Sequence, residues 1–131
     1  MERLTQRLNQ ARQALTSLQE LTGLERPTLV ERDAAIQRFE YTVEALWKTA
    51  QLTLSRRYGV ELASPKPVVR ACAQNGLLDE VDARAAMAMI DDRNLTAHTY
   101  NAPLAASIHG RLASHAELLE RWLTALEKGP E

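Results

Sequence analysis

Apolar residues in this chain recur at alternating steps of three and four positions, and no other feature of the sequence constrains its fold as strongly. This spacing places side chains along one face of an α-helix, whereas a half-buried β-strand needs an apolar residue at every second position. No strand-like alternation persists, and the sequence contains no glycine-rich phosphate loop and no internal repeat. The sequence therefore predicts an all-α protein.

Residues that start and stop helices divide this pattern into five predicted helices. Gly23 and Gly59 are suited to end the first two, Ser64 and Asp79 to cap the next two, and Pro103 to precede the last. The predicted helices cover 2–22, about 30–58, a short stretch from 65 to a stop at 75–76, a stretch from 80 into the segment 91–100, and 104–127. We expect an up-and-down bundle of four long helices plus one short helix, in a single domain of residues 1–131.

Length and charge limit the functions that the chain can have. A domain of 131 residues can bury a hydrophobic core without disulfides or metals. A net charge of -1 provides no overall field to hold nucleic acid, so any RNA contact must be local. No apolar run reaches the ~18 residues of a membrane span, and the first residues lack the apolar core of a signal peptide. We expect a cytoplasmic protein without membrane contacts.

The segment from Asp91 to Tyr100 concentrates the reactive side chains of the sequence. The imidazole of His98 can accept or donate a proton near physiological pH. Arg93 can stabilise the negative charge that develops on phosphorus, and Asn94 can orient the imidazole or a phosphate oxygen. Because RNA supplies its own 2′-hydroxyl nucleophile, this segment is suited to metal-independent cleavage of RNA.

The geometry of this segment leaves two interpretations open. On an ideal helix the side chains of Arg93 and His98 diverge by about 140°, so they converge only if the arginine reaches across or the helix loosens. A symmetric dimer would supply a second copy of both. Alternatively, these residues only cap a helix and form buried hydrogen bonds. Asp91 and Asp92 point about 100° apart on a helix, and the chain has no Cys or His cluster, so we predict no metal and no cofactor.

Three charged residues of the second predicted helix form a line beside its apolar stripe. Glu40, Glu44 and Lys48 are spaced by four positions. Glu44 and Lys48 would attract each other, whereas Glu40 and Glu44 would repel each other unless a cation lies between them. The line is either a solvated charged stripe or a carboxylate site for an arginine such as Arg93.

Two motifs in the sequence resemble those of one protein superfamily. Residues 93–100 resemble the R-N-x-x-x-H-x-Y signature of HEPN domains, specifically of their HepT-like branch. Residues 39–48 resemble the helix-two motif of the nucleotidyltransferase substrate-binding protein family within that superfamily. The Ser-Pro-Lys at 64–66 before a helix, and Asp92 directly before the arginine, also fit this pattern.

The resemblance implies a helical homodimer in which two R-N-x-x-x-H segments face each other across a cleft, and a minimal nucleotidyltransferase as its partner. In HepT-like toxins the residues at the positions of Arg93 and His98 cleave RNA, and the partner attaches AMP to the tyrosine at the position of Tyr100. The added anion would exclude an RNA phosphate by charge and by volume, which silences the toxin. The residues expected to support this site are Asp92, Asn94, Glu40, Glu44 and Lys48.

The same resemblance admits a role without catalysis. In this alternative the bundle binds a nucleotide or another substrate and presents it to the nucleotidyltransferase subunit. Arg93 and Asn94 would serve the phosphate of such a ligand equally well. We therefore expect a ribonuclease toxin, with a nucleotide-binding subunit as the alternative and a purely structural partner as a third possibility.

Overall fold

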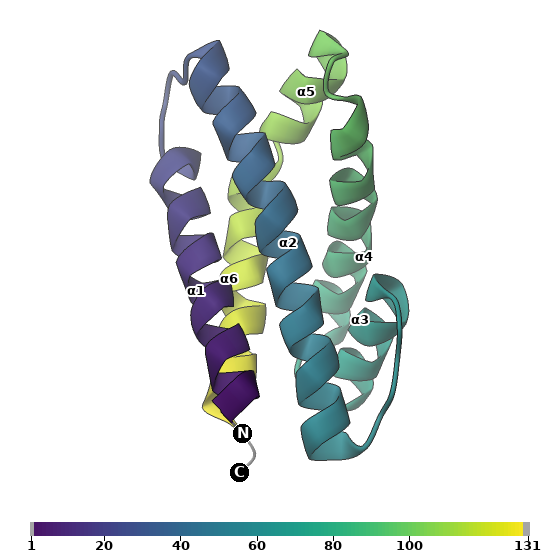
Figure 1. Cartoon of the computed structure of the whole chain (residues 1–131). Coiled ribbons are helices and arrows are strands. Elements are labelled where there is room, and N and C mark those ends of the chain that lie inside the picture. The colour runs from purple at the N-terminus through teal and green to yellow at the C-terminus, as the bar shows by residue number, and fades with distance from the viewer. Residues whose placement is uncertain (1, 130–131) are drawn as a thin grey trace.

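The computed structural model describes residues 2–129, and every regular element in this part of the chain is helical (Figure 1). The predicted all-α bundle is therefore confirmed. Residues 1 and 130–131 of the predicted domain lie outside the described residues. The elements are α1 (Glu2–Thr22), α2 (Leu29–Tyr58), α3 (Pro65–Gln74), α4 (Glu80–Leu95), the 3₁₀ turn η1 (Thr96–His98), α5 (Ala102–His109) and α6 (Leu112–Lys128).

Helix α2 is the central element of the bundle. It packs against every other α-helix of the described chain, while α6 also contacts α1 and α4. The long helices α1, α2, α4 and α6 run alternately up and down, so that the first and last helices bring both ends of the chain to the same end of the bundle (Figure 1). The short helix α3 lies near that end, and α5 lies near the opposite one.

The helix ends at Gly59 and Asp79 follow the capping signals in the sequence, whereas Ser64 occupies the N-cap position of α3 without a side-chain capping hydrogen bond. The Thr28 hydroxyl accepts a hydrogen bond from the Glu31 amide at 3.1 Å, and the Glu31 carboxylate accepts one from the Thr28 amide at 2.8 Å, which forms a capping box. At the other end of α2, Gly59 takes the left-handed conformation, with φ of 66°. Asp79 caps α4 by accepting a hydrogen bond from the Asp82 amide at 2.7 Å.

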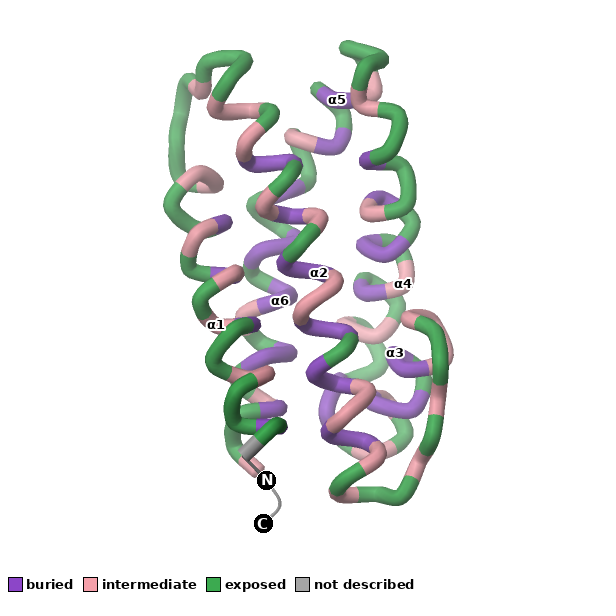
Figure 2. The backbone as a smooth tube through the Cα atoms, viewed as in Figure 1, coloured by how far each residue is buried: buried purple, intermediate pink, exposed green. Residues whose placement is uncertain are grey.

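The apolar residues that recur along α1 at steps of three and four lie in the core of the single chain rather than on a free surface. Along the bundle, buried segments of the helices face one another (Figure 2). Cys72 is also buried, and burial raises the pKa of its thiol to about 11, which keeps it protonated at neutral pH. The fully or nearly buried apolar residues of α1 are Leu4, Ala11, Leu15 and Leu18.

The single helix predicted over 104–127 is wrong, because the structure has two helices there. α5 ends at His109, and α6 begins at Leu112. The break falls at Gly110, and glycine has a low helix propensity. There the amide of Arg111 donates a hydrogen bond to the carbonyl of Ile108 at 2.9 Å. The described chain therefore has two short helices, α3 and α5, beside the four long ones.

The break brings two basic side chains onto a buried carboxylate of α4. Asp92 is only 7% exposed, and its two oxygens accept hydrogen bonds from Arg111 at 2.7 and 2.8 Å. His115 Nε2 lies 2.7 Å from Oδ2 of Asp92, and the His115 ring stacks on Phe39 with centroids 5.2 Å apart. Burial raises the pKa of Asp92, but the hydrogen bonds and charges of Arg111 and His115 outweigh it, so the pKa lies below its ordinary value.

We expect Asp92→Asn to lower the free energy of unfolding at pH 7 by about 3 kcal/mol, because Arg111 and His115 lose the anion that pairs with them. The pKa of Asp92 is lowered in the folded state. Its contribution is therefore complete above the ordinary carboxyl pKa of about 3.9 and is lost as the pH falls from there through the lowered pKa. Urea unfolding between pH 7 and about pH 2.5 measures both effects.

The matched control is Asp91→Asn, because Asp91 is an exposed neighbour that pairs with Lys66 at the surface. This change should alter the free energy of unfolding by less than ~1 kcal/mol. A difference between wild type and Asp92→Asn that stays constant as the pH falls would contradict a stabilising role for the carboxylate charge.

Candidate functional site

The segment with the predicted chemistry lies where α4 ends. The α-helix ends at Leu95 and tightens into the 3₁₀ turn η1. The Thr96 hydroxyl lies 2.6 Å from the carbonyl oxygen of Arg93 and 2.6 Å from Oε2 of Glu40, so the turn is tied to both α4 and α2. Thr99 donates to the Thr96 carbonyl at 3.1 Å. The regular α-helical geometry is therefore lost between Arg93 and His98.

Arg93 extends from α4 to a carboxylate of α2. Its Nη2 lies 2.8 Å from Oε1 of Glu44, and the other oxygen of Glu44 accepts a hydrogen bond from Trp47 Nε1 at 2.8 Å. The two charged side chains are 26% and 33% exposed. The Nε of Arg93 is buried and has no hydrogen-bond partner within residues 2–129. Glu44 therefore orients the guanidinium, while part of the Arg93 side chain stays exposed.

The other two residues of the predicted charged line have different surroundings. Glu40 accepts the hydrogen bond from Thr96 instead of pairing with a cation. Lys48 is exposed, and in the described part of the chain it forms no ion pair with Glu44. Glu44 thus holds Arg93, Glu40 holds η1, and Lys48 stands apart from both contacts.

His98 and Tyr100 form an exposed pair beyond α4. The Tyr100 hydroxyl lies 3.4 Å from Nδ1 of His98, and the two rings meet edge to face at a centroid distance of 6.0 Å. Tyr100 is 86% exposed, so its hydroxyl is open to a modifying enzyme. His98 is exposed as well, which leaves its ring free to contact a substrate.

The structure does not bring Arg93 and His98 together within one chain. Arg93 turns to α2, and no hydrogen bond or ion pair joins it to His98 among the described residues. The side chain of Asn94 is exposed and has no hydrogen-bonded partner in residues 2–129. Asp92 points to α6, so it can support the site only by fixing the end of α4.

Three residues that hold this region together were missed in the sequence. They are Thr96, which ties η1 to Glu40, and Arg111 and His115, which bind Asp92. The signal for His115 was present, because it occupies a position of the apolar stripe of the last helix, where an imidazole needs a polar partner. Thr96 and Arg111 carry no comparable signal.

Other sites of common types are not seen in the described chain. Within residues 2–129 no group of three His, Cys, Asp or Glu side chains could hold a metal ion. None of the described helices is both long and apolar enough to cross a membrane.

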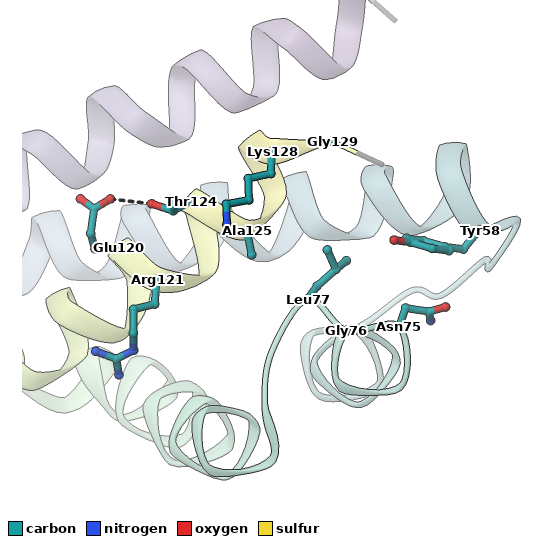
Figure 3. A pocket seen from close by; sticks show the side chains of 10 residues that line it. All are labelled: Tyr58, Asn75, Gly76, Leu77, Glu120, Arg121, Thr124, Ala125, Lys128 and Gly129. Atoms are coloured by element: carbon teal, nitrogen blue, oxygen red, sulfur yellow. Dashed lines mark hydrogen bonds between the residues drawn. The ribbon is translucent and has the colours of Figure 1, made fainter. Parts of the chain in front are cut away.

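A groove of about 670 Å³ lies at the other end of the bundle (Figure 3). Its polar side chains are largely engaged within the protein. Glu120 binds Arg12 and accepts a hydrogen bond from Thr124 at 3.0 Å, and Arg121 pairs with Asp82 at 2.9 Å. None of the residues that line this groove belongs to the segment 91–100. Arg93 and His98 are therefore not part of it.

Comparison with known proteins identifies the family of this chain. A family model described as nucleotidyltransferase substrate binding protein like matches residues 6–128. No curated protein sequence matches the chain. A crystal structure of a protein from Thermus thermophilus is similar, with 54% sequence identity and a TM-score of 0.86 over 88% of this chain and 98% of that one.

Two more distant structures share the fold. A tri-AMPylated HEPN toxin from Shewanella oneidensis in complex with an MNT antitoxin has 16% identity and a TM-score of 0.78, over 96% of this chain and 97% of that one. A mutant of the toxin–antitoxin MntA-HpeT has 16% identity and a TM-score of 0.81, over 98% of this chain and 100% of that one.

We expect Glu44→Gln to lower the free energy of unfolding by at most ~1 kcal/mol, because the ion pair with Arg93 is partly exposed. Glutamine keeps one acceptor oxygen in place of two, so it can accept a hydrogen bond from Arg93 or from Trp47, while its NH2 group faces the other donor. Lys48→Gln is the matched control and should change the free energy of unfolding by less than ~0.5 kcal/mol. Urea unfolding of both variants measures the values. A loss above ~2 kcal/mol in Glu44→Gln would mean that the pair is a main support of the fold.

Proposed function

This chain belongs to the family of nucleotidyltransferase substrate binding proteins, and we propose that it is a toxin of the HEPN superfamily that acts in a toxin–antitoxin pair. Its partner is a minimal nucleotidyltransferase that acts as the antitoxin. The toxin is a metal-independent endoribonuclease of the cytoplasm, with Arg93 and His98 as catalytic residues, and attachment of AMP to Tyr100 silences it.

The proposed cleavage uses the nucleophile that RNA carries. An imidazole of His98 removes the proton of a ribose 2′-hydroxyl, whose oxygen attacks the neighbouring phosphorus while the 5′-oxygen of the next nucleotide leaves with a proton. The products are a 2′,3′-cyclic phosphate and a 5′-hydroxyl. Arg93 stabilises the extra negative charge on the phosphoryl oxygens. Glu44 supports this role, since it fixes the guanidinium at 2.8 Å.

A homodimer is part of this proposal. One imidazole cannot remove a proton and donate one in the same step, and Arg93 and His98 point in different directions within one chain. Two chains around a twofold axis would provide two histidines and two arginines to one cleft. The exposed positions of Asn94 and His98 leave both side chains free for such a cleft.

The observation that carries the proposal is the position of Tyr100. Its hydroxyl is highly exposed and lies 3.4 Å from the His98 ring nitrogen. In the proposed modification this oxygen attacks the α-phosphorus of ATP, and pyrophosphate leaves. The attached AMP would place its phosphate and base beside His98, where they exclude the RNA. The related toxin from Shewanella oneidensis is described as tri-AMPylated and bound to its antitoxin, which supports this step.

The second candidate function is a nucleotide-binding subunit without catalysis. The description of the matching family, a nucleotidyltransferase substrate binding protein, favours it. Arg93, which is oriented by Glu44 and 26% exposed, would then bind a nucleotide phosphate. The two functions differ in one measurable property, which is cleavage of RNA by the chain alone.

We expect His98→Ala to abolish RNA cleavage in the presence of EDTA, while the variant keeps its fold and oligomeric state, because His98 is exposed and its ring has a hydrogen-bond contact only with Tyr100 among the described residues. Incubation of purified protein with several RNAs, with the products resolved by length, measures cleavage. His109→Ala is the matched control and should cleave at the wild-type rate. Equal cleavage by His98→Ala and wild type would remove His98 from the mechanism. No cleavage by wild type would favour the nucleotide-binding subunit.

We expect Tyr100→Phe to cleave RNA but to escape silencing by the nucleotidyltransferase, since it lacks the acceptor oxygen. Radiolabelled ATP and the purified partner show whether AMP is incorporated. Tyr58→Phe is the control, because Tyr58 is also a partly exposed tyrosine but lies outside the segment 91–100. Incorporation of AMP into Tyr100→Phe at the wild-type level would show that the acceptor lies elsewhere.

A further inference from the structure

Four basic side chains gather in a groove beside the first turns of α1 and the last turns of α2. The groove encloses about 330 Å³. Arg3 and Arg7 line it from α1, and Lys48 and Arg56 from α2, whereas Glu61 is the only acidic residue among the described side chains of its lining. We name this site the α1–α2 basic groove. Its four positive charges and one negative charge sum to +3, in a chain whose net charge is -1.

These four cations differ from many others in the protein because they lack counter-ions. In residues 2–129 none of them forms an ion pair, whereas Arg12, Arg38 and Arg121 are each paired with a carboxylate. The single acid of the groove is engaged by the hydroxyl of Ser55. Like charges held close together repel each other, and a bound anion would remove that repulsion.

The neutral part of the groove wall is fixed by a hydrogen bond within the chain. The amide of Gln51 donates to the carbonyl oxygen of Leu62 at 2.6 Å, which ties α2 to the loop that follows it. A second hydrogen bond joins the two helices, since the Thr49 hydroxyl donates to the carbonyl of Arg7 at 3.2 Å. The basic side chains therefore project from a rigid base.

Part of the α2 wall of the groove lies on the same face as the contact with Arg93, whereas Arg56 lies about 120° from Glu44 on an ideal helix. Lys48 follows Glu44 by one helical turn, and the side chains of Glu44, Lys48, Gln51 and Ser55 fall within about 60° of one another on an ideal helix. From Lys48 to Arg56 the helix rises about 12 Å, which is long enough for more than one phosphate of a strand. A chain of phosphates lying in the groove would therefore continue toward Arg93.

We propose that the α1–α2 basic groove binds the phosphate backbone of the single-stranded RNA that is cut at Arg93 and His98. The identity of the strand as substrate rests on the proposed function, whereas the charge of the groove does not. Arginine and lysine neutralise phosphates without reading the bases, so the groove binds RNA regardless of sequence. In this proposal Lys48, which forms no ion pair with Glu44 among the described residues, contributes a positive charge that binds phosphate.

The test uses a fluorescent 2′-O-methyl RNA oligonucleotide, which carries the phosphates but lacks the nucleophile needed for cleavage. Fluorescence anisotropy gives its dissociation constant at several salt concentrations. The variant Arg7→Gln/Lys48→Gln removes two charges from the groove, and Arg3→Gln/Arg56→Gln removes the other two. The matched control, Arg26→Gln/Arg70→Gln, removes two exposed charges from elsewhere on the surface. Circular dichroism melting checks that all variants are folded.

Each groove variant should weaken binding of the oligonucleotide about 25-fold at 0.1 M salt. It should also reduce the slope of log K against log salt by about 1.4. Each variant removes two phosphate contacts, and each contact contributes about 0.7 to the slope for single strands. The control should stay within about twofold of wild type. Equal weakening in the control and the groove variants would overturn the proposal, since binding would then follow overall charge. Absence of binding by wild type at low salt would also overturn it.

The experiment separates this proposal from the proposed ribonuclease function. Groove-dependent binding of the oligonucleotide, with no cleavage of ordinary RNA, would support the groove and contradict the ribonuclease. Cleavage of ordinary RNA that depends on His98 but has the same kcat/KM in the groove variants would support the ribonuclease function and contradict the role of the groove.

Discussion

The geometry of the candidate site depends on the buried carboxylate of Asp92. It binds Arg111 and His115, and so fixes the end of α4 against the start of α6. Adjacent residues on a helix point about 100° apart, so a helix end that turns Asp92 inward directs Arg93 elsewhere, in this case toward Glu44 of α2. Rotating this end would leave a buried charge unpaired at a cost of several kcal/mol. Asp92 thus orients a site that it does not contact.

Much of the fold could be predicted because its helices carry local signals. The apolar seams, the capping threonine and aspartate and the glycine after α2 each act within a few residues. The break between α5 and α6 could not be predicted from spacing, because Ile108, Leu112 and His115 continue the apolar pattern across it. What fixes the chain at that break is the contact of Arg111 with Asp92, 19 residues earlier, and such a contact leaves no periodic trace.

For the candidate site the sequence predicted candidate residues, but not most of the contacts that those residues make. The four-residue spacing of Glu40 and Glu44 predicted a cation between the two carboxylates. Arg93 supplies a cation, but it pairs with Glu44 alone. The partner of Glu40 is instead the hydroxyl of Thr96, which depends on α4 tightening into a 3₁₀ turn. The surroundings of Lys48 depend on how α1 packs on α2, since two arginines of α1 share its groove. These contacts follow from tertiary packing, which single-sequence periodicity does not encode.

The site divides its residues between a rigid part and an exposed part, and this division bears on the proposed regulation. Arg93 is held by Glu44, and Glu44 is held in turn by Trp47, so this part is anchored in the bundle. His98 and Tyr100 lie on an exposed turn and contact mainly each other. A nucleotide attached to Tyr100 would therefore displace no core side chain and would cost the fold little stability. Its effect would be confined to the volume and charge around His98, so that the modification could silence the reaction and leave the bundle intact.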